Sequence, residues 1–112
     1  MVNHKYGTFS DEQFEYAKKK IQKNIFFLLL CVDPNTKDNY NNIDINNTIN
    51  SLLYKLNGMN EILFYPSELV DVMSLLEAAK LEYKNIDFNF KIYRKLILDA
   101  GSEIMKVKSC VT

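Results

Sequence analysis

Apolar residues recur at three- and four-residue steps over most of the chain, which is the spacing of amphipathic helices. The first such stretch predicts a helix over residues 11–32. Ser10 and Gln13 stand at the spacing of a capping box at its start, and Asp11 and Glu12 lie in the first turn, where the helix dipole favours acids. Asp33-Pro34 ends the helix because a residue before proline avoids the α region.

Three further apolar stripes predict three further helices. Asp44 is the expected N-cap of the second helix, and Gly58 is its expected left-handed C-cap. The third helix is expected to begin at Pro66 and run to about Tyr83, and the fourth to be capped by Asp87. The sequence therefore predicts one all-α domain over residues 1–112, a compact bundle of about four helices, mostly antiparallel.

The segments outside these stripes are expected to be irregular. Residues 1–9 show no periodicity and are expected to form a flexible arm, whereas residues 33–43 are rich in Asn and Asp and form a polar loop. Residues 59–65 fit either a short helical turn or an apolar connector. Gly101 falls inside the fourth helix next to Ala100, where it would let a neighbouring helix approach closely.

Residues 25–32 are apolar on every face. A helix of this kind must be covered on all sides, either by the rest of the bundle or by a partner. A buried β-strand is the alternative, since short apolar runs are ambiguous. The unbroken helical spacing from Ser10 favours the helix.

Composition and charge narrow the classes of function. The formal net charge is zero, from 14 basic and 14 acidic residues, which disfavours a general polyanion binder and permits self-association. The polar first residues and two cysteines without a disulfide pattern favour the cytoplasm. Abundant Asn, Lys and Ile suggest an AT-rich genome, such as that of a bacterium or phage.

Residue types that carry chemistry are sparse. His4 stands in the expected arm, and Cys31 and Cys110 form no Cys-x-x-Cys pair, so neither a zinc site nor a nucleophile is expected. Asp99 and Glu103 are expected to pair with Lys95 or Lys106 on their own helix. We expect no cofactor and no catalytic residue.

Two acidic pairs favour an alternative function. Glu12-x-x-Glu15 and Glu68-x-x-Asp71 resemble the pattern of all-α nucleoside triphosphate pyrophosphohydrolases. This resemblance implies Mg²⁺ held by carboxylates from facing helices. The two pairs depart from that family in standing on non-consecutive helices, with no Lys or Asn following at the family's position.

A second alternative is a nucleic-acid-binding accessory protein. Four lysines lie on the first helix, opposite its apolar stripe, and could contact phosphates: Lys18, Lys19, Lys20 and Lys23. A solvated helix face explains the same pattern, and no recognition-helix motif accompanies it.

The leading hypothesis is a non-enzymatic protein–protein interaction module, a regulator, inhibitor or immunity-type factor that binds another protein or itself. The chain holds seven Phe, seven Tyr and four Met, and Tyr and Met are favoured at interfaces. The surplus of apolar side chains marks a candidate contact surface: Phe26, Phe27, Leu30, Phe64 and Tyr65.

Overall fold

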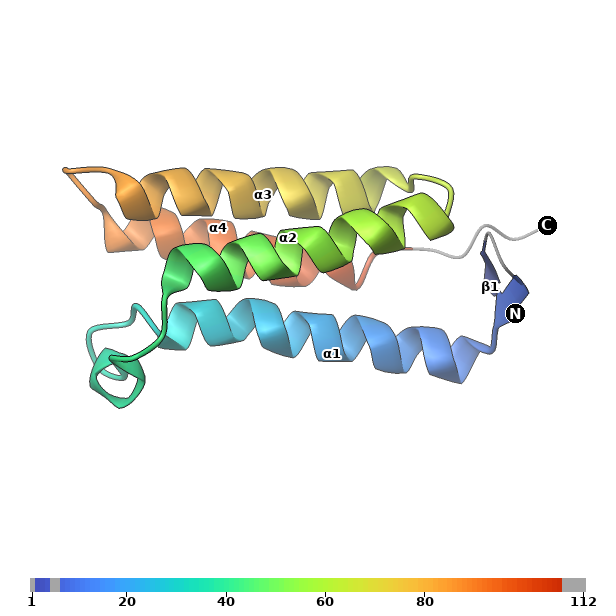
Figure 1. The fold of residues 1–112 in the computed structure, drawn as a ribbon, viewed down its shortest axis with the longest axis horizontal. Helices are drawn as coiled ribbons and strands as arrows, with labels where there is room; N and C mark the ends of the chain where they lie inside the picture. Colours follow the sequence, from blue (N-terminus) through green and yellow to red (C-terminus); the bar gives the residue numbers. More distant parts are fainter. Residues whose placement is uncertain (1, 5–6, 108–112) are drawn as a thin grey trace.

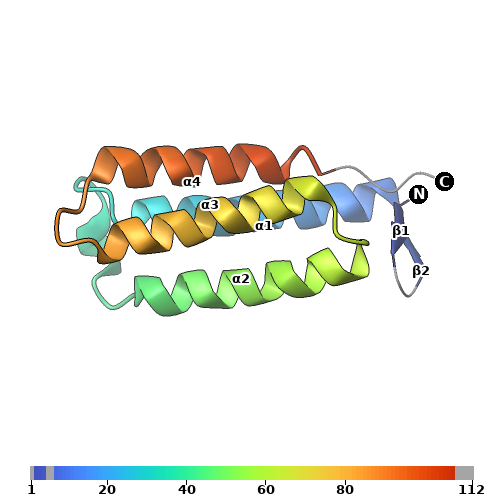
Figure 2. The ribbon, with the colours of Figure 1, turned by 90° about the horizontal axis from the view of Figure 1, so that it is seen from above.

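Four helices run alternately up and down in the computed structural model, which describes residues 2–4 and 7–107 (Figure 1). They are α1 (Asp11–Leu30), α2 (Ile45–Ile62), α3 (Ser67–Lys84) and α4 (Phe90–Ile104). Seen from above in Figure 2, α4 lies beside α3, and its contacts with α3 and α1 are the most extensive in the bundle. The expected all-α bundle is confirmed.

The elongated bundle has two ends, the tip end and the hairpin end. The tip end holds the turn between α3 and α4, the C-terminus of α1 and residues 33–43, in which Lys37–Tyr40 form a turn of 3₁₀ helix, η1. The hairpin end holds the start of α1, the turn between α2 and α3, and two short strands, β1 (Val2–His4) and β2 (Gly7–Phe9).

The strands correct the expectation for residues 1–9, to which the pattern assigned no regular structure. β1 and β2 pair in antiparallel register, with Val2 opposite Phe9 and His4 opposite Gly7. Strands of three residues are too short to show an alternating apolar pattern, so the sequence carried no signal for them. Gly7 adopts a φ of 150°, a conformation that L side chains rarely adopt.

The expected start of α1 is confirmed. The Ser10 hydroxyl accepts a hydrogen bond from the Gln13 amide at 3.1 Å, and the Ser10 amide donates to Gln13 Oε1 at 3.0 Å. These reciprocal bonds satisfy two backbone donors that a helix start leaves free. Within residues 25–32 the helix continues to Leu30, so the alternative of a β-strand is wrong.

The core lies along the four inward helix faces. Ile25 and Leu28 of α1 are fully buried, as are side chains from each of the other helices: Ile49, Leu56, Leu69, Val72, Leu76, Ala79, Tyr93, Ile97 and Ile104. Gly101 allows the predicted close approach, because a Cβ at this position would lie 2.6 Å from Cζ of Phe26. No helix in the described part of the chain is long and apolar enough to cross a membrane.

Three expected helix ends differ by a few residues. Asp44 caps α2 as expected, but Gly58 lies inside that helix, which continues because Asn60 and Leu63 are still buried. Pro66 is the N-cap of α3 and not its first residue. Asn89 caps α4 in place of Asp87, and its Oδ1 accepts hydrogen bonds from the Lys91 and Ile92 amides.

Candidate interaction surface

The structure separates the five side chains of the expected contact surface. Phe26 packs against Gly101, and Phe27 makes an edge-to-face contact with Tyr40, their ring centroids 5.2 Å apart, so both are partly buried. Leu30 is exposed at the tip end, whereas Phe64 and Tyr65 are exposed at the hairpin end of a molecule 46 Å long (Figure 1). These residues do not form one surface.

Phe64 and Tyr65 form an unusual helix ending. The Tyr65 amide donates to the Asn60 carbonyl at 2.8 Å and the Phe64 amide to the Glu61 carbonyl at 3.4 Å, the pattern of a Schellman motif. Phe64 has a φ of 64° and Tyr65 a φ of 59°, whereas glycine usually occupies the left-handed position. Two exposed aromatic residues thus hold a backbone conformation that disfavours them.

A denser group of exposed apolar side chains surrounds the turn between α3 and α4. We call it the α3–α4 tip, and it consists of Leu81, Tyr83, Ile86, Phe88 and Ile92. Ile86 is fully exposed, Leu81 is 68% exposed and Ile92 is 49% exposed. Single exposed apolar residues are ordinary, but five within twelve positions around one turn make the α3–α4 tip a candidate contact surface.

Aromatic packing fixes the tip in place. The Tyr83 and Phe88 rings meet edge to face with centroids 5.9 Å apart, and Phe88 meets the fully buried Tyr93 at 5.8 Å. Tyr93 in turn donates a hydrogen bond of 2.8 Å from its hydroxyl to the Leu28 carbonyl of α1. The exposed ring edges at the tip are therefore anchored to the core.

The polar groups of the same turn bond inward to the backbone. Asn85 Oδ1 accepts from the Asp87 amide at 3.0 Å, and Glu82 Oε1 accepts from the Asn89 amide at 2.8 Å. Ile86, between them, points none of its surface into the protein. Exposure of Ile86 is thus a property of a bonded turn, and such preorganisation lowers the entropy lost on binding.

Sequence reasoning missed the tip because it rested on the apolar stripes of the helices. Phe88 and Ile92 stand outside those stripes, and Tyr83 marked only the expected end of the third helix. One signal was present. Ile86 stands in Asn85-Ile86-Asp87, a turn in which polar residues are expected and a large aliphatic residue has no local role. The exposure of its neighbours depends on how α3 and α4 pack, which the spacing does not contain.

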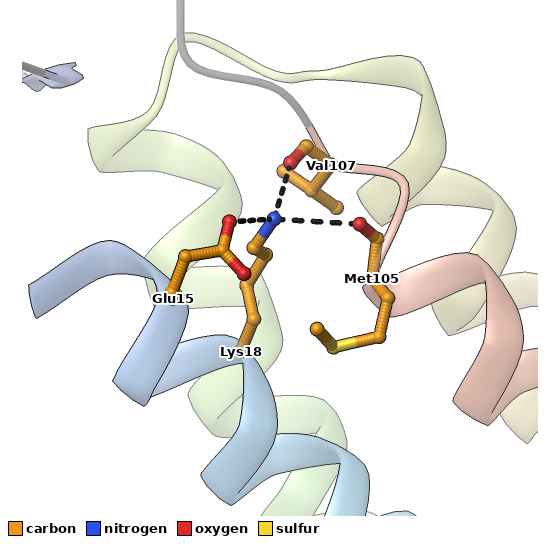
Figure 3. Close-up of polar contacts among 4 residues, drawn as sticks. All are labelled: Glu15, Lys18, Met105 and Val107. Atoms are coloured by element: carbon orange, nitrogen blue, oxygen red, sulfur yellow. Dashed lines mark hydrogen bonds and ion pairs between the residues drawn. The ribbon is translucent and has the colours of Figure 1, made fainter. Parts of the chain in front are cut away.

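Lys18 does not belong to the expected basic face, because its side chain is buried and only 5% exposed. As Figure 3 shows, its ammonium contacts the Glu15 carboxylate at 2.8 Å and the carbonyls of Val107 and Met105 at 3.1 and 3.3 Å. Nζ also lies 4.8 Å from the centre of the Phe14 ring. Lys18 thus ties α1 to the carbonyls that follow α4, and this is a structural role.

The other three lysines of that face lie as expected. Lys19, Lys20 and Lys23 are exposed on α1. Their charges form a smaller basic patch than the four-lysine face inferred from the sequence. Nucleic-acid binding through this patch stays a prediction.

The acidic pairs do not converge. Glu12 and Glu15 lie on α1 and Glu68 and Asp71 on α3, two helices that each pack against α2 and α4. Within residues 2–4 and 7–107, no three His, Cys, Asp or Glu side chains group as a metal site requires. Pyrophosphohydrolase activity through these residues stays a prediction without a geometric basis.

Asp71 instead lines a shallow depression between α3 and α4 with Asp99 and Glu103. Lys95 Nζ lies 3.0 Å from the Asp99 carboxylate and Lys106 Nζ lies 3.3 Å from that of Glu103, so the expected pairing along α4 is confirmed. These lysines offset much of the acidic charge in the depression.

The remaining candidates for chemistry are one thiol and one imidazole. Cys31 is buried at the C-cap of α1, and burial raises the pKa of its thiol, which opposes formation of the reactive thiolate. The backbone of His4 lies in β1. Cys110 lies outside the described residues.

Comparison with known proteins adds no assignment: no family model, curated protein or solved structure matches this chain. The fold class is that of an antiparallel four-helix bundle.

Proposed function

We propose that this protein is a non-enzymatic helical interaction module that binds another protein through the α3–α4 tip. The observation that carries the proposal is the full exposure of Ile86 among four other exposed apolar side chains, on a turn held by its own hydrogen bonds. Burying Ile86 alone would contribute about 2–3 kcal/mol to binding.

The ring cluster beneath the tip supports the same proposal. Tyr83 and Phe88 are each 37% exposed, so a partner can cover their free edges without disturbing their contacts with Tyr93. Aromatic anchors that lose little entropy on binding are typical of interaction hot spots. Whether the module acts as a regulator, inhibitor or immunity-type factor follows from the identity of the partner.

Site-specific photo-crosslinking in cells of the organism that encodes the chain tests the proposal. A benzophenone amino acid at position 86 is expected to form a covalent adduct with one partner protein, whose crosslinked peptide mass spectrometry identifies. Tyr54, 82% exposed on α2, provides the matched control position. Adducts of equal yield and composition from positions 86 and 54, or none from position 86, would contradict a contact at the tip.

A further inference from the structure

The segment that carries the α3–α4 tip is basic although the whole chain is neutral. Residues 80–95 contain five basic and two acidic residues. The Glu82 carboxylate accepts a hydrogen bond from the Asn89 amide, and Lys95 forms an ion pair with Asp99. Within residues 80–95, three exposed cations have no carboxylate partner among residues 7–107, and we call them the basic rim: Lys84, Lys91 and Arg94.

Lys91 in this rim opposes a local preference. It is the second residue of α4, whose first turn contains no acid, and the dipole at a helix N-terminus disfavours a cation there. Side chains on a helix lean toward its N-terminus, so Lys91 and Ile92 both lean toward the turn. Departures from local rules concentrate at functional sites, and a carboxylate from outside would relieve this one.

Charge and area together indicate what covers the tip. The five apolar side chains expose on the order of 500 Å², whereas each partner of a stable complex buries about 800 Å². The contact must therefore extend beyond these five side chains, and the residues of the basic rim are their neighbours in the sequence. In a symmetric dimer built on this surface, the rim would face its own copy, and like charges opposed across an interface are unfavourable.

We infer that the α3–α4 tip docks an acidic amphipathic segment of another protein. Large apolar side chains of that segment cover Ile86, Ile92 and the free edge of Phe88, and its carboxylates pair with the rim residues Lys84, Lys91 and Arg94. This inference rests on the proposed function and adds the chemical class of the partner.

An anionic membrane surface could also bind exposed apolar side chains and cations, but the tip offers little apolar surface to insert into it. Tyr83 and Phe88 keep most of their surface in the ring cluster, which leaves Ile86 as the fully exposed side chain at the turn. Even a fourteen-carbon acyl chain gives only marginal membrane binding, and the exposed parts of Leu81, Ile86 and Ile92 together offer less apolar surface than such a chain.

Fluorescence anisotropy with two labelled peptides tests the inference. One is an amphipathic helix of eighteen residues with Leu and Phe on one face and Glu on the other, and its counterpart carries Lys for every Glu. The intact chain is expected to bind the Glu peptide, more weakly as salt rises, and to leave the Lys peptide free. The variant Lys91→Glu/Arg94→Glu is expected to bind the Glu peptide roughly tenfold or more weakly and to bind the Lys peptide, which the natural chain does not.

Matched variants separate local from general charge effects. Lys19→Glu/Lys20→Glu changes the net charge equally on the exposed face of α1 and is expected to alter binding of the Glu peptide by less than about twofold. Ile86→Ser is expected to weaken binding of the Glu peptide by about tenfold or more without changing the helical circular dichroism spectrum. Equal binding of both peptides, or equal effects of the two charge-reversed variants, overturns the inference.

Two further measurements distinguish the other occupants. Co-sedimentation with vesicles of phosphatidylcholine and phosphatidylserine that depends on Ile86, without peptide binding, would assign the tip to a membrane. Self-association that Ile86→Ser abolishes would assign it to a second copy. A crosslinked partner whose contacting segment is basic or neutral would leave the proposed function standing and overturn only the acidic docking partner.

Discussion

The ring of Phe26 occupies the space that a side chain at Gly101 would need. A Cβ built on Gly101 would overlap Cε1 of that ring and lie 2.6 Å from Cζ. Gln22, one turn earlier on α1, donates from Nε2 to the Gly101 carbonyl at 2.9 Å. At this point the packing of α1 against α4 therefore depends on one missing side chain and one hydrogen bond.

Substitution of the two helical glycines is expected to have opposite effects. Gly58 in α2 has nothing within 4 Å of a built Cβ, so Gly58→Ala should raise the free energy of unfolding by about 0.5–1 kcal/mol. Gly101→Ala gains the same propensity but must displace Phe26, and overpacking costs about 1–3 kcal/mol. Urea denaturation is expected to show Gly101→Ala as net destabilised.

A double-mutant cycle checks the cause. Phe26→Leu shortens the ring that meets position 101, so Gly101→Ala should be less harmful in that background than in the natural chain. Equal costs in both backgrounds would show that Phe26 does not set the approach of the helices.

Lys18→Met is expected to destabilise the protein by about 2–4 kcal/mol. The change keeps the length of the side chain but leaves the Val107 and Met105 carbonyls without their donor and removes the partner of Glu15. Lys19→Met, on the exposed neighbour, is expected to change stability by less than about 0.5 kcal/mol. Amide hydrogen exchange at the end of α4 should accelerate only for Lys18→Met, and unchanged exchange there would contradict the capping role.

The left-handed backbone at Phe64 predicts that a Gly variant is more stable than an Ala variant there, the reverse of the usual order in a helix. Phe64→Ala and Phe64→Gly both remove the exposed ring, but only glycine adopts a φ of 64° without strain, so Phe64→Gly should be more stable by about 1 kcal/mol. At Asn57, inside α2, the Ala variant should be the more stable by a similar amount. Thermal unfolding of the four variants tests both orders.

The helices could be predicted from the sequence because the residues that specify them lie close together along the chain. Apolar spacing and capping residues act within a few positions, so Ser10 and Asp44 were identified as caps without tertiary information. Gly58 was misread because a glycine near the end of a stripe resembles a C-cap. The buried Leu63 shows that packing further along the chain extends α2 beyond it.

The surface was harder to predict because it depends on contacts between distant residues. The carbonyls that Lys18 binds are 87 and 89 positions away. A local signal did exist, because Lys18 lies four residues after Phe14 and seven before Ile25, within the apolar stripe of α1. Ile86 had no comparable signal beyond its place in a polar turn.

Tyr93 is expected to make the protein lose stability at alkaline pH. Its side chain is fully buried, and burial, followed by the nearby Cys31 and Tyr83, raises the pKa of its hydroxyl above the ordinary value. Above about pH 10 the unfolded chain releases this proton while the folded chain retains it, so the free energy of unfolding should fall as pH rises.

Tyr93→Phe removes the hydrogen bond to the Leu28 carbonyl and should cost about 1 kcal/mol at pH 8. Between pH 10 and 11 that variant should lose less stability than the natural chain, whereas Tyr54→Phe, at an exposed position, should follow the natural chain. Urea denaturation at each pH measures both slopes, and parallel slopes for all three proteins would show that another group governs the alkaline loss.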